Sequence, residues 1–83
     1  MAIFGGSPTI VSTTIAYNTA VGGGGILIAD GSTASLRASL VEQNVGYFTG
    51  GGVLIVNGAA PSIDACVVRA NRSTSGGGIE VLE

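Results

Sequence analysis

Residues 22–31 read GGGGILIADG: four glycines, three large aliphatic residues, an alanine and an Asp-Gly turn signal. Related stretches follow at residues 49–58, TGGGVLIVNG, and at residues 75–83, SGGGIEVLE. The glycine run therefore belongs to an internal repeat of 26 or 27 residues. A repeat of this length is typical of chains built from stacked, structurally equivalent units.

Three asparagines align the repeats, since Asn18, Asn44 and Asn71 are 26 and 27 residues apart. A large aliphatic residue lies eight positions and again three positions before each asparagine, and a small residue lies five positions before it. In chain order these residues are Ile10, Leu36 and Ile63; Ile15, Val41 and Val68; and Thr13, Ser39 and Cys66. So many features at one period indicate a structural repeat.

The composition of the repeat favours strands over helices. Glycine fills 15 of 83 positions, and Thr, Val, Ile and Ser are abundant, whereas no apolar stripe is long enough for a helical repeat. Each unit fits one turn of a β-solenoid, whose short strands stack on their counterparts about 4.8 Å away. We predict an all-β fold in one domain: a parallel β-helix of about three turns, at residues 5–30, 31–57 and 58–83.

The run SPTIVSTTIAYNTAVGGGGI at residues 7–26 resembles the repeat of right-handed parallel β-helix proteins of the pectate-lyase-like superfamily. It is most similar to the Asn- and Gly-Gly-Ile-rich type of bacterial surface and secreted proteins, including polymorphic outer-membrane proteins. The resemblance covers nearly the whole chain, in three copies. It implies a right-handed coil, an extracellular or cell-surface parent protein, and an internal ladder formed by Asn18, Asn44 and Asn71.

Stacking also explains the polar residues. An inward asparagine beside an aliphatic core is tolerated only when its amide is hydrogen-bonded, and identical side chains in successive turns supply the partners. Arg37 and Asp64 both lie seven positions before an asparagine, and Glu42 and Arg69 both lie two positions before one. We predict two opposite-charge pairs between adjacent turns, each contributing about 0.2–1 kcal/mol.

The glycine run lacks the chemistry of a phosphate loop. Such a loop needs a Lys and a Ser or Thr after the last glycine, whereas Ile26, Val53 and Ile79 follow here. No helix follows to bind an anion. We expect a tight corner instead, with positive φ angles and close backbone approach between turns.

The composition argues against several classes of function. The net charge is −2 and the three arginines form no stripe, so nucleic-acid binding is not expected. Cys66 is the only cysteine and His is absent, so we expect neither an internal disulfide nor a Cys-based zinc site, and Cys66 is interpreted as a small buried hydrophobe. No apolar stretch reaches the roughly 18 residues of a membrane span, so we expect no membrane insertion. No signal peptide is recognised, and both ends are interpreted as boundaries of a segment cut from a longer protein.

The acidic residues form no catalytic pattern. The two carboxylates of a glycoside hydrolase lie about 5–9 Å apart, and the alignment of the repeats brings no two acids together. The five acids are Asp30, Glu42, Asp64, Glu80 and Glu83. We expect no catalytic residue, no cofactor and no metal site.

Leu27 and Leu54 occupy equivalent outward positions, beside Ala29 and Val56, and we expect them to form an exposed apolar strip. A carbohydrate or a second copy of the chain would suit such a strip. Because carbohydrate platforms usually present aromatic rings and this strip has none, self-association is the preferred interpretation. The open ends of a three-turn solenoid point the same way, so we predict a homo-oligomer, with closed symmetry favoured over fibres in a soluble protein.

These observations lead to two principal hypotheses of function. In the first, the chain is a non-catalytic, structural and self-associating segment of an extracellular or cell-surface β-helix protein. In the alternative, it is a fragment of a polysaccharide lyase or hydrolase whose catalytic turns lie outside this chain. A disordered glycine-rich linker is a third, less favoured reading.

Overall fold

The computed structural model describes residues 1–74 and 77–82, and these residues form short β-strands and turns with no helix. In chain order the strands are β1 (Ala2–Phe4), β2 (Thr9–Val11), β3 (Thr14–Ala16), β4 (Thr19–Gly22), β5 (Ile26–Ala29), β6 (Ser35–Arg37), β7 (Leu40–Glu42), β8 (Val45–Thr49), β9 (Val53–Val56), β10 (Ser62–Asp64), β11 (Val67–Arg69) and β12 (Ile79–Leu82). Their shortness follows from the sequence, because a turn residue or a glycine ends each run after three to five positions.

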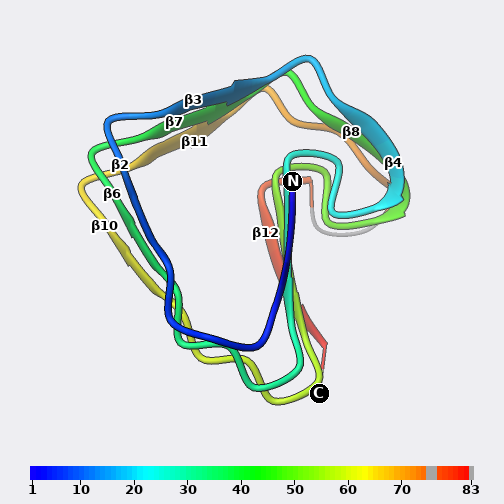
Figure 1. Cartoon of the computed structure of the whole chain (residues 1–83). Helices are drawn as coiled ribbons and strands as arrows, with labels where there is room; N and C mark the ends of the chain where they lie inside the picture. The colour runs from blue at the N-terminus through cyan, green and yellow to red at the C-terminus, as the bar shows by residue number, and fades with distance from the viewer. Residues whose placement is uncertain (75–76, 83) are drawn as a thin grey trace.

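The strands pair in parallel and stack into narrow sheets with the orders β1-β5-β9-β12, β2-β6-β10, β3-β7-β11 and β4-β8. Viewed along the stacking axis, the successive turns superimpose (Figure 1). The chain runs clockwise as it recedes from the viewer, which makes the coil right-handed. The prediction of an all-β parallel solenoid of about three turns is confirmed.

Aliphatic side chains stack in ladders inside the coil, as the alignment on the asparagines predicts. The most deeply buried members come from the middle of the stack and include Ile26, Ile28, Leu36, Val41 and Val53. The register pairs define four ladders: Ile10, Leu36 and Ile63; Ile15, Val41 and Val68; Ile26, Val53 and Ile79; and Ile3, Ile28, Ile55 and Val81. The core is therefore narrow, and branched aliphatic side chains fill it without large aromatic rings.

Residues with positive φ form the corners of the coil, and several of these residues are not glycine. Ser12, Ala38 and Ala65 have φ of 51°, 48° and 52° and connect the first strand of each turn to the second. Hydrogen bonds between turns hold these corners: the Ser12 N–H donates to the Arg37 carbonyl and the Ala38 N–H to the Asp64 carbonyl, each at 3.1 Å. An L-residue in this conformation costs roughly 1–2 kcal/mol, so stacking between turns offsets strain that is repeated at every corner.

Along the glycine run the backbones of adjacent turns leave no room for a side chain. A Cβ built on Gly25 would lie 2.5 Å from the Gly52 carbonyl oxygen, and one built on Gly52 would lie 2.5 Å from that of Gly78. Hydrogen bonds cross between the runs, since the N–H groups of Gly24 and Gly25 donate to the carbonyls of Gly50 and Gly51. The glycines are needed here because any side chain would meet backbone of the next turn.

The prediction that Leu27 and Leu54 form an exposed apolar strip is wrong. The two residues are register partners on β5 and β9 and lie outside the core cluster, but Leu54 is only 6% exposed and Leu27 is half-buried. Before each of these strands the chain folds back as a corner with positive φ, at Gly23 and Gly50, and packs on the leucines. A Cβ on Gly50 would lie 2.5 Å from the Leu54 Cβ, so the corner covers the face that the sequence left open.

Candidate functional site: an asparagine ladder between two open ends

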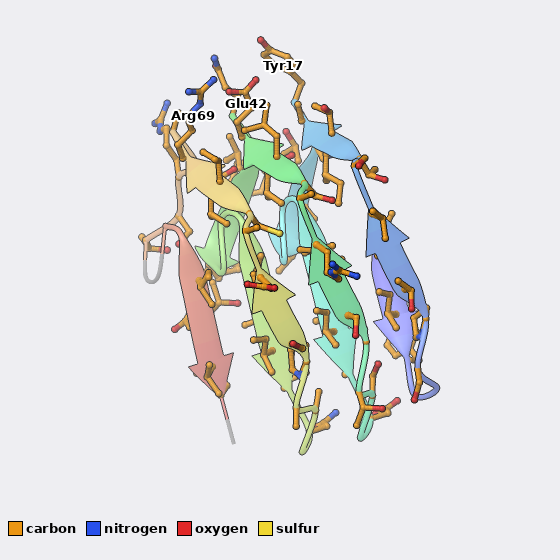
Figure 2. The ribbon with its side chains drawn as sticks, turned by 90° about the vertical axis from the view of Figure 1, so that its left-hand side faces the viewer. Tyr17, Glu42 and Arg69 are labelled. Carbon is orange, nitrogen blue, oxygen red and sulfur yellow. The ribbon has the colours of Figure 1, made fainter. Side chains whose placement is uncertain are left out.

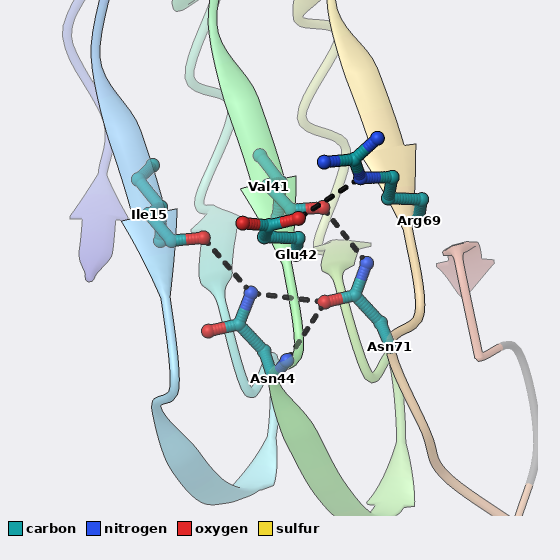
Figure 3. A network of polar contacts seen from close by, with 6 residues as sticks. All are labelled: Ile15, Val41, Glu42, Asn44, Arg69 and Asn71. Atoms are coloured by element: carbon teal, nitrogen blue, oxygen red, sulfur yellow. Dashed lines mark hydrogen bonds and ion pairs between the residues drawn. The ribbon is translucent and has the colours of Figure 1, made fainter.

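Asn18, Asn44 and Asn71 lie at equivalent positions of successive turns and form a one-way ladder of hydrogen bonds. Figure 3 shows the step from Asn44 to Asn71. The Nδ2 amide of Asn18 donates to Oδ1 of Asn44 at 3.0 Å, and Nδ2 of Asn44 donates to Oδ1 of Asn71 at 2.9 Å. Each backbone N–H of the first two asparagines donates to the same oxygen that its side chain does. The Oδ1 atom of each higher rung therefore accepts two hydrogen bonds from the rung before it.

A second set of hydrogen bonds fixes the amides to the preceding turn. Nδ2 of Asn44 also donates to the Ile15 carbonyl at 3.1 Å, and Nδ2 of Asn71 donates to the Val41 carbonyl at 3.0 Å. Asn44 is 0% exposed, and every buried side-chain N or O atom among the described residues has a partner. Satisfying a buried amide so completely gives the ladder a strong preference for one register.

A second polar ladder lies five positions before the asparagines. The Thr13 N–H donates to Oγ of Ser39 at 3.1 Å, and the thiol of Cys66 lies 3.3 Å from the Leu36 carbonyl. Cys66 is thus a half-buried free thiol in a position where the other turns carry hydroxyls. Its environment is that of a small residue in the stack.

The two predicted charge pairs differ in the structure. Nε of Arg69 donates to Oε1 of Glu42 at 2.9 Å, on the outer edge that also carries Tyr17 (Figure 2). Arg37 and Asp64 are register partners on β6 and β10, yet their side chains form no ion pair. The register places the two backbones side by side, but it does not fix the rotamers of long, exposed side chains. The charged groups of such a pair therefore need not meet.

Other acids also contact neighbouring turns. The Gly50 N–H donates to Oε1 of Glu80 at 2.9 Å, and Nδ2 of Asn57 donates to Oδ1 of Asp30 at 3.1 Å. Glu83 lies outside the described residues. No group of three His, Cys, Asp or Glu side chains gathers in residues 1–74 and 77–82. Asp30, Glu42 and Glu80 thus accept hydrogen bonds from neighbouring turns.

Exposed apolar side chains lie in places that the sequence reasoning missed. Val21, Tyr47 and Phe48, here called the β8 patch, lie on the adjacent strands β4 and β8, and the two rings are 64% and 65% exposed. These residues come three or four positions after an asparagine. Comparing those positions across the repeats could have found the patch.

The last turn also ends in exposed apolar residues. Ile79 and Val81 of β12 are 47% and 59% exposed, whereas their register partners Val53 and Ile55 are 0% and 7% exposed. A pocket of about 480 Å³ opens beside Val81. Its lining consists of Ile55, Val56, Gly58, Ala59, Val81 and Leu82. The core ladders thus reach the surface at this end.

Comparison with known proteins adds no family to these observations. No protein-family model matches the chain, and neither characterised proteins nor solved structures give a significant match. Among the described residues, none forms a helix that could cross a membrane.

Proposed function

We propose that the chain is a non-catalytic, self-associating segment of a β-helix protein that is extracellular or on the cell surface. The parallel solenoid and the likeness of residues 7–26 to the pectate-lyase-like repeat support this proposal. The polar groups support it too, because the asparagines, Glu42, Asp30 and Glu80 make contacts between turns. These are contacts that hold a stack together.

The observation that carries the proposal is the shape of the molecule with its open ends. The Cα extents are 27 × 27 × 15 Å, so the coil is wider than it is long. Its ends are large relative to its sides, and the ends of the aliphatic ladders and unpaired strand edges lie there. Burying apolar surface returns about 25 cal/mol per Å², and strand edges recruit further strands.

Sedimentation equilibrium of the purified chain tests this proposal. We expect masses that are multiples of 8.1 kDa at micromolar concentrations. A soluble monomer that persists at high micromolar concentration would contradict self-association.

A polyuronate cleavage assay with calcium tests the non-catalytic part. We expect no unsaturated product from this chain. Release of such a product would favour the alternative, in which the chain belongs to a polysaccharide lyase.

Carbohydrate binding is a second candidate function, and the β8 patch favours it. Tyr47 and Phe48 present aromatic rings to solvent beside Val21, and rings of this kind stack on sugar faces. Titration with neutral oligosaccharides, followed by tyrosine fluorescence, should show binding that Tyr47→Ala weakens. Unchanged fluorescence at millimolar sugar would exclude the patch as a carbohydrate platform.

A further inference from the structure

We infer that a second copy of the chain binds the last turn by head-to-tail stacking, with β12 of the first copy in the place of β1 of the second. This inference rests on the proposed self-association and specifies its geometry, which is an open head-to-tail stack and not the closed symmetry expected from the sequence. It follows from the unequal number of strands in the sheets. One sheet has four strands, β1-β5-β9-β12, whereas β2-β6-β10 and β3-β7-β11 have three.

The register makes β1 and β12 equivalent positions three turns apart. Ile3 pairs with Ile28, Ile28 with Ile55, and Ile55 with Val81, so Ile3 and Val81 occupy the same position along the sheet. When a second copy continues the coil, its β2 lies on β10 and its β3 lies on β11. Its β1 then falls on the place that β12 already fills. In-register stacking therefore requires either β12 of the first copy or β1 of the second copy to detach from its sheet.

The strand with the shorter pairing is β1, although the terminal amino group of Met1 and the N–H of Gly5 also donate to the turn that it pairs with. It pairs with β5 through three residues, whereas β12 pairs with β9 through four. Glu80 of β12 also accepts a hydrogen bond from the Gly50 N–H. We therefore place β12 in the joint, where it lies between β9 of its own chain and β5 of the second copy.

The asparagine ladder gives the two ends complementary hydrogen-bonding groups. No described residue accepts from the Asn71 backbone N–H, the group that in Asn18 and Asn44 donates to the next rung. At the opposite end, Asn18 Oδ1 has no donor among the described residues, although Asn44 and Asn71 Oδ1 each have two. Stacking brings the Asn71 donors to the Asn18 oxygen of the second copy. It also brings the Asn18 amide to the Val68 carbonyl, the counterpart of those of Ile15 and Val41.

Charges agree with head-to-tail stacking. Residues 1–29 contain no Asp, Glu, Lys or Arg, so the charged strands β10 and β11 of the last turn meet strands β2 and β3, which carry no charged side chain. By register, Asp64 opposes Val11 and Arg69 opposes Ala16, and no like charges come together. The pocket beside β12 is covered in the same step, because the turn at residues 5–8 continues the coil above Gly58 and Ala59.

Reversible disulfides in the full chain test which strand leaves. In a Cys66→Ser background, Phe4→Cys with Ala29→Cys links β1 to β5, since these two positions are register partners. The matched control, Val56→Cys with Leu82→Cys, links β9 to β12 at the equivalent positions. Neighbouring strands lie about 4.7–4.9 Å apart, within the Cα separation that disulfides accept. Circular dichroism verifies the β fold of each oxidised form before sedimentation velocity is measured.

We expect the oxidised β1 link to abolish association and reduction to restore it, while the β12 link leaves association unchanged. Association that survives in both oxidised forms overturns this inference and leaves the proposed function standing. A β12 link that blocks association overturns the choice of strand. An unmodified chain that stays monomeric overturns both the inference and the proposed function.

Amide exchange of the unmodified chain gives an independent readout. The Asn71 N–H should exchange more slowly as the protein concentration, and with it the sedimenting mass, increases. Exchange at Asn71 that stays constant while the mass grows contradicts a joint at this end.

Discussion

Asn44 carries more of the fold's specificity than any aliphatic residue beside it. Its side chain donates to Ile15 and Asn71 and accepts from Asn18 by two N–H groups, all without exposure to water. An aliphatic side chain can be buried against many different neighbours, but a fully satisfied amide needs its particular hydrogen-bond partners in place. The hydrogen bonds of Asn44 thus specify one register, whereas packing of the aliphatic ladders is compatible with it but less specific.

Asn44→Leu should reduce the free energy of unfolding by about 3 kcal/mol or more, because it leaves the buried donors and acceptors of neighbouring turns unpaired. Urea denaturation at fixed protein concentration measures this loss. Asn18→Leu is the matched control, since Asn18 is exposed at the first turn and its loss removes fewer interactions. Equal effects of the two substitutions would contradict a ladder centred on Asn44.

At the residue scale, the backbone is also strained at the non-glycine corner residues, which have positive φ. Ala38 adopts a φ of 48°, whereas Ala60 is not among the residues with positive φ. Ala38→Gly should raise the free energy of unfolding by about 1 kcal/mol, since glycine accepts this conformation at little cost. Ala60→Gly should instead lower it by about 0.4–1 kcal/mol through the entropy of the unfolded chain. Thermal melts of the two variants should move in opposite directions, and a shared direction would argue against strain at the corner.

At the scale of elements, the glycine run both forms a corner of the coil and packs over the outer face of the β5-β9 sheet. Its first part turns with positive φ at Gly23 and Gly50 and packs on the outer leucines, while its second part lies flat on the run of the next turn. One segment therefore closes the outer face of the β5-β9 sheet and joins two turns. Several glycines are needed in each repeat because those that form the corner are not the glycines that contact the next turn.

Gly25→Ala should lower the free energy of unfolding by about 3 kcal/mol, the upper part of the usual range for an overpacked interior, because the new methyl group meets backbone oxygen at 2.5 Å. Gly31→Ala is the control. A Cβ there has nothing within 4 Å, and only its φ of +71° opposes the change, so the loss should be about 1–2 kcal/mol. If both variants melt alike, steric contact between turns is not what the glycine at position 25 provides.

The register of the outer strands can be measured through charge. A double-mutant cycle on Glu42 and Arg69 should give a coupling of about 0.2–1 kcal/mol, because this pair is in contact at the surface. The same cycle on Arg37 and Asp64 should give a coupling close to zero, although these residues are register partners. A larger coupling for the second pair would mean that its side chains meet in solution.

At the scale of the whole molecule, the middle of the stack is protected on both sides and the last turn on one. Amides of β9 should therefore exchange more slowly than those of β12 when the chain is dilute. Native-state hydrogen exchange resolved by residue measures the difference. Uniform protection from β9 to β12 would indicate that the chain opens only as a single unit.

The sequence predicts the inside of this molecule better than its outside. The ladders of Asn44 and Val41 follow from spacing, because inward residues must match their counterparts in every turn. Coverage of Leu54 could not be derived this way, since it depends on the path of the chain between the asparagine and the strand, where the units differ in length. The missing Arg37–Asp64 contact has another cause. Both side chains are exposed, and the register of their strands does not determine which rotamers they adopt.

The one-way ladder has an electrical consequence. An amide group carries a dipole of about 3.5 D, and the side-chain amides of Asn18, Asn44 and Asn71 donate in the same direction along the axis. Their moments add, with the positive end at the last turn and the negative end at the first. Each added rung polarises the others, so a longer stack should hold its next member more tightly than a short one. Growth of such a stack would be cooperative, and a lag before assembly in dilute solution would reveal it.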